Sequence, residues 1–180
     1  MTIVYARAAV VAVVTLGSLA ITACTPAHRI GAHTPESRAA ALAFVDREGI
    51  RFDVEYTINT RVLHAAFPRG GSLPMLKAYD SRGQLLFEAV GNKSDTVDRL
   101  DRALQRSTPV GEGDALSSEL ALVEPRDGRL PQTTDLPTAE WIVVVHWASW
   151  CDACRALLDQ LRERHAQRSG RLVLVGINWD

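Results

Sequence analysis

The sequence predicts an α/β fold, and three observations support that prediction. Residues 141–147 and 171–177 are nearly continuous apolar runs rich in β-branched side chains, as expected of strands covered on both faces. Between them, apolar residues recur at helical spacing: Cys154, Leu157, Leu158 and Leu161. Residues 73–79 and 85–90 flank a turn signal, which predicts a hairpin. Together these patterns predict a mixed central sheet flanked by helices.

The composition is that of an ordinary globular chain. It has 180 residues, 47% hydrophobic and 23% charged, which excludes collagen-like, low-complexity and wholly disordered proteins. The 20 basic and 21 acidic residues leave a net charge of −1, so no nucleic-acid partner is expected.

The N-terminal segment has the features of a secretory signal. Residues 1–23 contain one charge, Arg7, followed by an apolar run that ends in small residues. Ile21-Thr22-Ala23-Cys24 resembles the lipobox of bacterial lipoproteins. That resemblance implies that residues 1–23 are removed and that Cys24 is lipidated, with residues 24–33 as a tether. The protein would then be extracytoplasmic, facing the periplasm on either the inner or the outer membrane. An uncleaved membrane-spanning anchor is the alternative.

Helix and strand signals alternate over residues 34–67. Thr34 can cap a helix, Pro35 suits its first turn, and Gly49 can end it. Residues 51–58 alternate in polarity as a strand does, and residues 60–67 can form a short helix.

The predicted hairpin is followed by another helix. The turn between its strands is Asp80-Ser81-Arg82-Gly83. Gly91 precedes a helix capped by Ser94, whose apolar face is formed by Val97, Leu100 and Leu104.

Two cysteines, Cys151 and Cys154, stand where the strand of residues 141–147 leads into a helix. The unpaired N–H groups and partial positive charge of a helix N-terminus favour a thiolate at Cys151. Cys151 would attack a substrate disulfide, and Cys154 would resolve the mixed disulfide. Other roles for this cysteine pair are less well supported. A structural zinc site needs four ligands and the sequence offers no second pair, and covalent haem attachment requires His where Arg155 stands. A purely structural disulfide between these cysteines would close only a tiny loop.

The segment Trp147–Cys154, WASWCDAC, resembles the active site of thioredoxins, and WASWC in particular resembles the membrane-anchored TlpA-like branch. The resemblance implies a thioredoxin-like fold with Cys151 and Cys154 as catalytic residues. It also implies that Trp150, Asp152 and Ala153 support them.

The two halves of such a fold stand in reverse order here. A thioredoxin continues after its CxxC unit with a helix, a strand opened by proline, another strand and a final helix. We therefore expect a circular permutation. Residues 34–106 would be the C-terminal half, residues 107–118 a linker, and residues 119–180 the N-terminal half with the CxxC. The alternative is a truncated domain beside an unrelated N-terminal domain.

The resemblance assigns roles to Leu73 and Pro74 as well. It implies a cis Leu73–Pro74 bond beside the CxxC, with the Leu73 backbone pairing with a substrate strand. A trans proline at the start of an edge strand is the alternative. Val145 stands where thioredoxins carry a buried aspartate, and the neighbouring His146 should point to the opposite face of the sheet as a core residue.

These features predict a thiol–disulfide oxidoreductase. An anion at Asp152 disfavours the Cys151 thiolate and so favours a reducing couple. The expected substrates are disulfides of exported proteins, the expected electron donor is a membrane protein, and the redox-active disulfide needs no cofactor or metal. One alternative is a copper(I)-binding, metallochaperone-like protein using Cys151, Cys154 and His146 or another histidine. The other is a redox-inert interaction domain.

Overall fold

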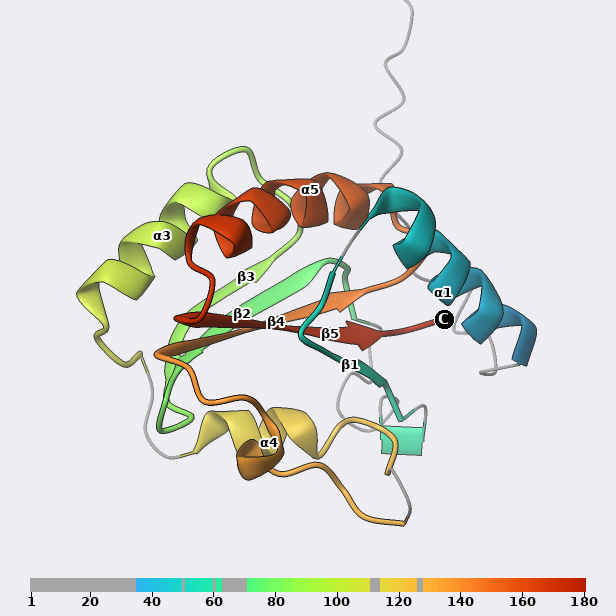
Figure 1. The fold of residues 1–180 in the computed structure, drawn as a ribbon, viewed down its shortest axis with the longest axis horizontal. Coiled ribbons are helices and arrows are strands. Elements are labelled where there is room, and N and C mark those ends of the chain that lie inside the picture. Colours follow the sequence, from blue (N-terminus) through green and yellow to red (C-terminus); the bar gives the residue numbers. More distant parts are fainter. Residues whose placement is uncertain (1–34, 50, 60, 63–70, 111–113, 126–127) are drawn as a thin grey trace, which may run out of the picture.

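The fold is built on one mixed five-stranded sheet with the strand order β1-β5-β4-β2-β3 (Figure 1). The computed structural model describes residues 35–49, 51–59, 61–62, 71–110, 114–125 and 128–180. Strands β1, β5 and β4 are parallel, β2 is antiparallel to β4, and β3 is antiparallel to β2. The strands are β1 Val54–Thr57, β2 Met75–Asp80, β3 Leu85–Val90, β4 Trp141–Trp147 and β5 Leu172–Asn178.

Helices cover both faces of this sheet. Figure 1 shows α1, α3 and α5 on one face and the short α4 on the other. Their bounds are α1 Pro35–Glu48, α3 Thr96–Arg106, α4 Ala115–Leu120 and α5 Asp152–Gln167, with a 3-10 turn η2 at Thr133–Asp135.

Strands β4 and β5 form the centre of the core. All seven residues of each strand are buried, as the continuous apolar runs predicted. Their parallel register pairs Trp141 with Leu172 and Trp147 with Asn178, so both strands end at the same edge of the sheet. The predicted helix between them is α5, and it buries Cys154, Leu157, Leu158 and Leu161.

The two halves of the chain share this sheet. Strand β1 pairs with the outer side of β5, and β2 pairs with the free side of β4. The unpaired edge that residues 141–177 would present alone is therefore covered by strands from earlier in the chain. Residues from both halves belong to a single buried apolar cluster.

The first half follows the predicted order of elements. Helix α1 starts at Pro35 and stops before Gly49, whose φ of 63° is the left-handed conformation that glycine adopts easily. Helix α3 buries Val97, Leu100 and Leu104 as predicted. The predicted cap at Ser94 is wrong, because the helix starts at Thr96 and Asp95 occupies the N-cap position.

The segment predicted as a linker, residues 107–118, ends inside α4. The Asp114 carboxylate caps this helix by accepting the Ser117 N–H at 2.9 Å, and the Leu116 N–H donates to the Gly83 carbonyl at 3.1 Å. Leu116, Glu119 and Leu120 are buried beneath the sheet. The connection between the halves therefore covers one face of the core.

Several predictions concern residues that the structure does not describe. The signal of residues 1–23, the lipidation site Cys24, the tether of residues 24–33 and the cap Thr34 all lie outside the described residues. So does most of the helix expected over residues 60–67. Among the described residues, no helix has the length and apolarity needed to cross a membrane.

Candidate functional site

The CxxC pair lies where β4 ends and α5 begins, as predicted. Cys151 and Cys154 form a disulfide, and Cys151 is the N-cap residue of α5. The Cys151 Sγ accepts the Cys154 N–H at 3.2 Å, and the Cys151 N–H donates to the Ala148 carbonyl at 3.1 Å. The Cys151 sulfur therefore sits at the N-terminal, positive dipole end of a 16-residue helix.

Both cysteines are enclosed in the disulfide state. Cys151 is 1% exposed and Cys154 is fully buried, whereas Trp150 and Ala153 are half-buried and Asp152 is exposed. Another sulfur could therefore reach Cys151 only if neighbouring side chains moved.

Three aromatic rings support the strand that leads into the site. The fully buried Trp147 ring stacks on Phe44 of α1, at 5.6 Å between centroids, and on Phe52, at 5.8 Å. The Phe52 ring lies against the backbone of Gly176 on β5. The Arg155 guanidinium, one residue after Cys154, lies 5.2 Å from the centre of the Phe44 ring. Helix α1 is thereby held against the start of α5.

Residues 178–180 run alongside the segment that precedes the CxxC. The Trp179 backbone N–H donates to the Trp147 carbonyl at 2.9 Å. The Asp180 carboxylate accepts the Ser149 N–H at 2.8 Å and the Ser149 hydroxyl at 2.6 Å. The Asn178 side-chain amide donates to the same carboxylate at 2.8 Å. These bonds fix the backbone of residues 147–149, and sequence reasoning assigned no role to Asp180.

Leu73 and Pro74 lie at the same edge of the sheet. The Leu73–Pro74 peptide bond is cis, as the thioredoxin resemblance implied. Met75 pairs with His146 in the antiparallel β2–β4 ladder, so the two residues before Met75 run alongside Trp147 and the turn that carries Cys151. The side chains of Leu73 and Pro74 are both buried.

A buried polar cluster lies on the other face of the sheet. His146 is fully buried, as predicted, and contacts Glu119 of α4 through Nε2 and Trp179 through Nδ1. The other Glu119 oxygen, Oε2, lies 2.5 Å from Lys77 Nζ and 3.1 Å from the Tyr79 hydroxyl. The one available sequence signal was His146 itself, because a histidine inside an apolar strand needs polar partners.

The charges in this cluster perturb its titration. Burial by itself raises the pKa of Glu119, but its hydrogen bonds to His146 and Lys77, with the positive charge of Lys77, outweigh burial and lower the pKa from 4.5 to about 2. The pKa of Tyr79 is raised, first by burial and then by the neighbouring Glu119 charge. Glu119 is therefore a carboxylate at any physiological pH.

Among the residues that the structure describes, His146 does not lie where it could be a third ligand for a copper ion at the cysteines. Both ring nitrogens of His146 are already hydrogen-bonded, on the face of the sheet that carries α4. Within the described ranges, no three His, Cys, Asp or Glu side chains gather closely enough to hold a metal.

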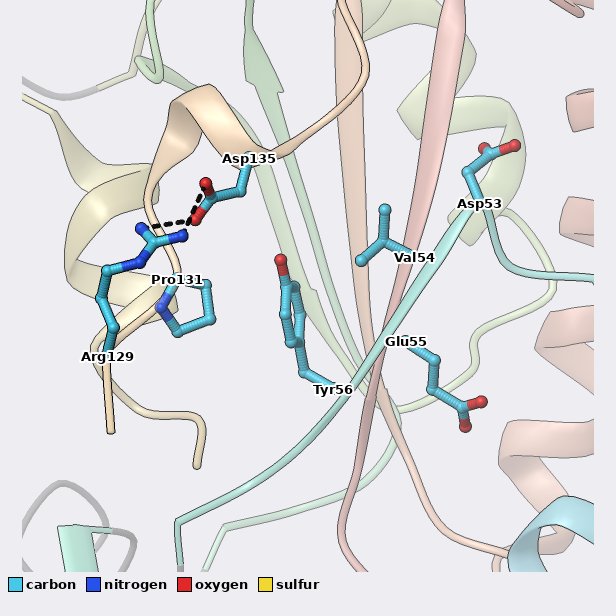
Figure 2. Close-up of a pocket in the computed structure, with 7 residues that line it drawn as sticks. All are labelled: Asp53, Val54, Glu55, Tyr56, Arg129, Pro131 and Asp135. Carbon is cyan, nitrogen blue, oxygen red and sulfur yellow. Dashed lines mark hydrogen bonds and ion pairs between the residues drawn. The ribbon is translucent and has the colours of Figure 1, made fainter. Parts of the chain in front are cut away.

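One concavity lies away from the cysteines, between β1 and residues 129–135. It has a volume of about 700 Å³. Figure 2 shows the Arg129–Asp135 ion pair on one wall and Tyr56 extending from β1 toward it. None of the predicted site residues lines this pocket.

No protein-family model, curated protein or solved structure matches this chain.

Proposed function

We propose that this chain is an extracytoplasmic thiol–disulfide oxidoreductase with a circularly permuted thioredoxin-like fold. The observation that carries the proposal is the Cys151–Cys154 disulfide at the start of α5, with the Cys151 sulfur as acceptor of a helix N–H. This environment stabilises a thiolate at Cys151 once the disulfide is reduced.

The reaction proceeds by two exchanges. In the reduced protein, the Cys151 thiolate attacks one sulfur of a substrate disulfide, and the other substrate sulfur leaves as a thiolate that takes up a proton. The Cys154 sulfur, having lost its proton, attacks Cys151 and displaces the second substrate thiolate. The substrate gains two electrons, and the Cys151–Cys154 disulfide is restored. A membrane dithiol protein reduces that disulfide for the next cycle.

The order of elements in space supports the permutation. Helix α1 follows β5 in position, as the next helix of a thioredoxin-like chain would, and β1 adds a strand that pairs with the outer side of β5. Strand β2, which Pro74 precedes, then pairs beside β4 at the CxxC edge, and β3 and α3 complete the fold. The lipobox resemblance at Cys24 supports membrane anchoring, and the exposed Asp152 supports a reducing rather than an oxidising couple.

Trapping the mixed disulfide tests this function. The Cys154→Ser variant cannot resolve the intermediate, so incubation of the reduced variant with insulin should yield a covalent adduct that dithiothreitol releases. The matched Cys151→Ser variant retains one thiol of the pair but should form little adduct and show no reductase activity. Equal adduct yields from both variants, or no insulin reduction by the wild-type protein, would overturn the proposal.

A further inference from the structure

A continuous hydrogen-bonded path joins α4 to the segment before the CxxC. Glu119 contacts His146 Nε2, and the Trp179 indole N–H donates to His146 Nδ1 at 2.9 Å. All three side chains are at least nine-tenths buried. The path crosses from a short helix under the sheet to the residue that follows β5.

The chemistry of these groups defines the protonation of His146. An indole N–H can only donate, so Nδ1 of His146 accepts and carries no proton. Nε2 then bears the imidazole proton and donates it to the Glu119 carboxylate. Lys77, at 2.5 Å from the same carboxylate, keeps Glu119 ionised. Glu119 thus selects the His146 tautomer whose Nδ1 can accept the Trp179 indole N–H.

Trp179 links the His146 ring to residues 147–149, the segment that precedes the CxxC. Its backbone N–H holds the Trp147 carbonyl, and the adjacent Asp180 holds Ser149. Between Trp147 and Ser149, the Ala148 carbonyl accepts the Cys151 N–H. A rotation of the Trp179 ring would therefore disturb the backbone that carries the Cys151 sulfur.

We propose that Glu119 and His146 are positioning residues for the cysteine pair, acting through Trp179 from the opposite face of the sheet. The inference rests on the proposed redox function and adds to it a role for residues outside the CxxC. Losing the Trp179 indole donor would uncouple His146 from this path and so change the exchange rate at Cys151. Among the described residues, the charged or titratable groups beside this path include Lys77 and Tyr79 of β2, Glu88 of β3, whose Oε1 lies 3.8 Å from Lys77 Nζ, and the Asp180 carboxylate on Ser149. Lys77, Tyr79 and Glu119 also line a pocket of about 530 Å³.

Two measurements on the full chain, purified in detergent, test the proposal. Nitrogen NMR of the histidine side chains should show His146 protonated at Nε2 and unprotonated at Nδ1 near pH 7. The second measurement is the rate at which iodoacetamide alkylates Cys151 in the reduced protein, followed from pH 5 to 9. In Trp179→Phe this rate should differ from the wild-type rate by roughly threefold or more, with a changed pH profile. This variant removes the indole N–H but keeps a ring. The matched control is Trp141→Phe at the far end of β4, which should leave the profile unchanged.

The outcomes separate this inference from the proposed function. A wild-type rate and pH profile in Trp179→Phe, or a His146 ring protonated at Nδ1 near pH 7, would overturn the positioning role while leaving the redox function intact. Failure of wild-type Cys151 to exchange with insulin would overturn both. Glu119→Gln gives an independent arm, and its His146 should lose the fixed tautomer. If Glu119→Gln does not fold, Trp179→Phe alone decides, because it leaves the Glu119–Lys77 pair in place.

Discussion

The Asp180 carboxylate accepts two hydrogen bonds from Ser149, one from the backbone N–H at 2.8 Å and one from the hydroxyl at 2.6 Å. Asp180 is only 8% exposed. The contact joins the residue that follows Trp179 to the turn that leads into Cys151. Because the acceptor is a buried carboxylate, these bonds are stronger than ordinary bonds to a neutral acceptor.

Removal of this carboxylate should destabilise the protein measurably. We expect Asp180→Ala to lower the free energy of unfolding by about 2–3 kcal/mol, since it leaves the Ser149 donors without their acceptor. Asp180→Asn, which keeps one oxygen, should lose less. Urea unfolding followed by tryptophan fluorescence measures both. The control is Asp159→Ala, which breaks an exposed pair with Arg162 and should change stability by less than about 1 kcal/mol. An Asp180→Ala protein as stable as the control would contradict the role given to Asp180.

Close packing at Gly176 should make even a methyl group destabilising. A Cβ at this position would lie 2.9 Å from ring atoms of Phe52, which is itself stacked on Trp147. We expect Gly176→Ala to lower the free energy of unfolding by about 1–3 kcal/mol through overpacking. A double-mutant cycle with Phe52→Leu provides the control, because a smaller side chain should recover part of that loss. Strictly additive effects of the two substitutions would show that the ring is not what excludes the methyl group.

Glu119 should make the stability depend on acidity. Its pKa is about 2 in the folded protein against an ordinary 4.5, so its ionised form stabilises the fold above about pH 4.5. That contribution is lost as the pH falls from 4.5 toward 2, where the carboxyl group protonates. Unfolding free energies measured between pH 5 and 2 should therefore fall more steeply in the wild-type protein than in Glu119→Gln.

The control for this titration is Glu124→Gln, an exposed carboxyl five residues along the chain. It should leave the slope unchanged. Carbon NMR of the Glu119 carboxyl group gives the same answer directly. A midpoint at or above 4.5 would contradict the ion pairing that we assign to Glu119.

Much of the fold was predictable because its signals are local. The apolar runs of β4 and β5, the glycine after α1 and the hairpin turn each define an element within a few residues. The CxxC could also be placed at a helix start, because strand and helix periodicities meet there. The disulfide and the position of Pro74 agree with what the thioredoxin resemblance implied.

The remaining parts depend on distant partners. Helix α4 has only six residues, too few to show a periodicity, and it lies in a polar stretch that reads as a linker. Glu119 is 3% exposed although glutamate is almost never fully buried unless it is paired. Its partners Lys77 and His146 lie 42 and 27 residues away, so no local pattern could connect them.

The measurement that tests the central claim most directly is the reduction potential of the Cys151–Cys154 pair. Thiol trapping of the folded protein across a dithiothreitol redox series gives the fraction of disulfide at each potential. We predict one cooperative two-electron transition, below the cytosolic glutathione range of about −220 to −260 mV, as a reductase requires. A potential near about −120 mV would reverse the direction of transfer. The absence of any such transition in folded protein would contradict a redox function for this chain.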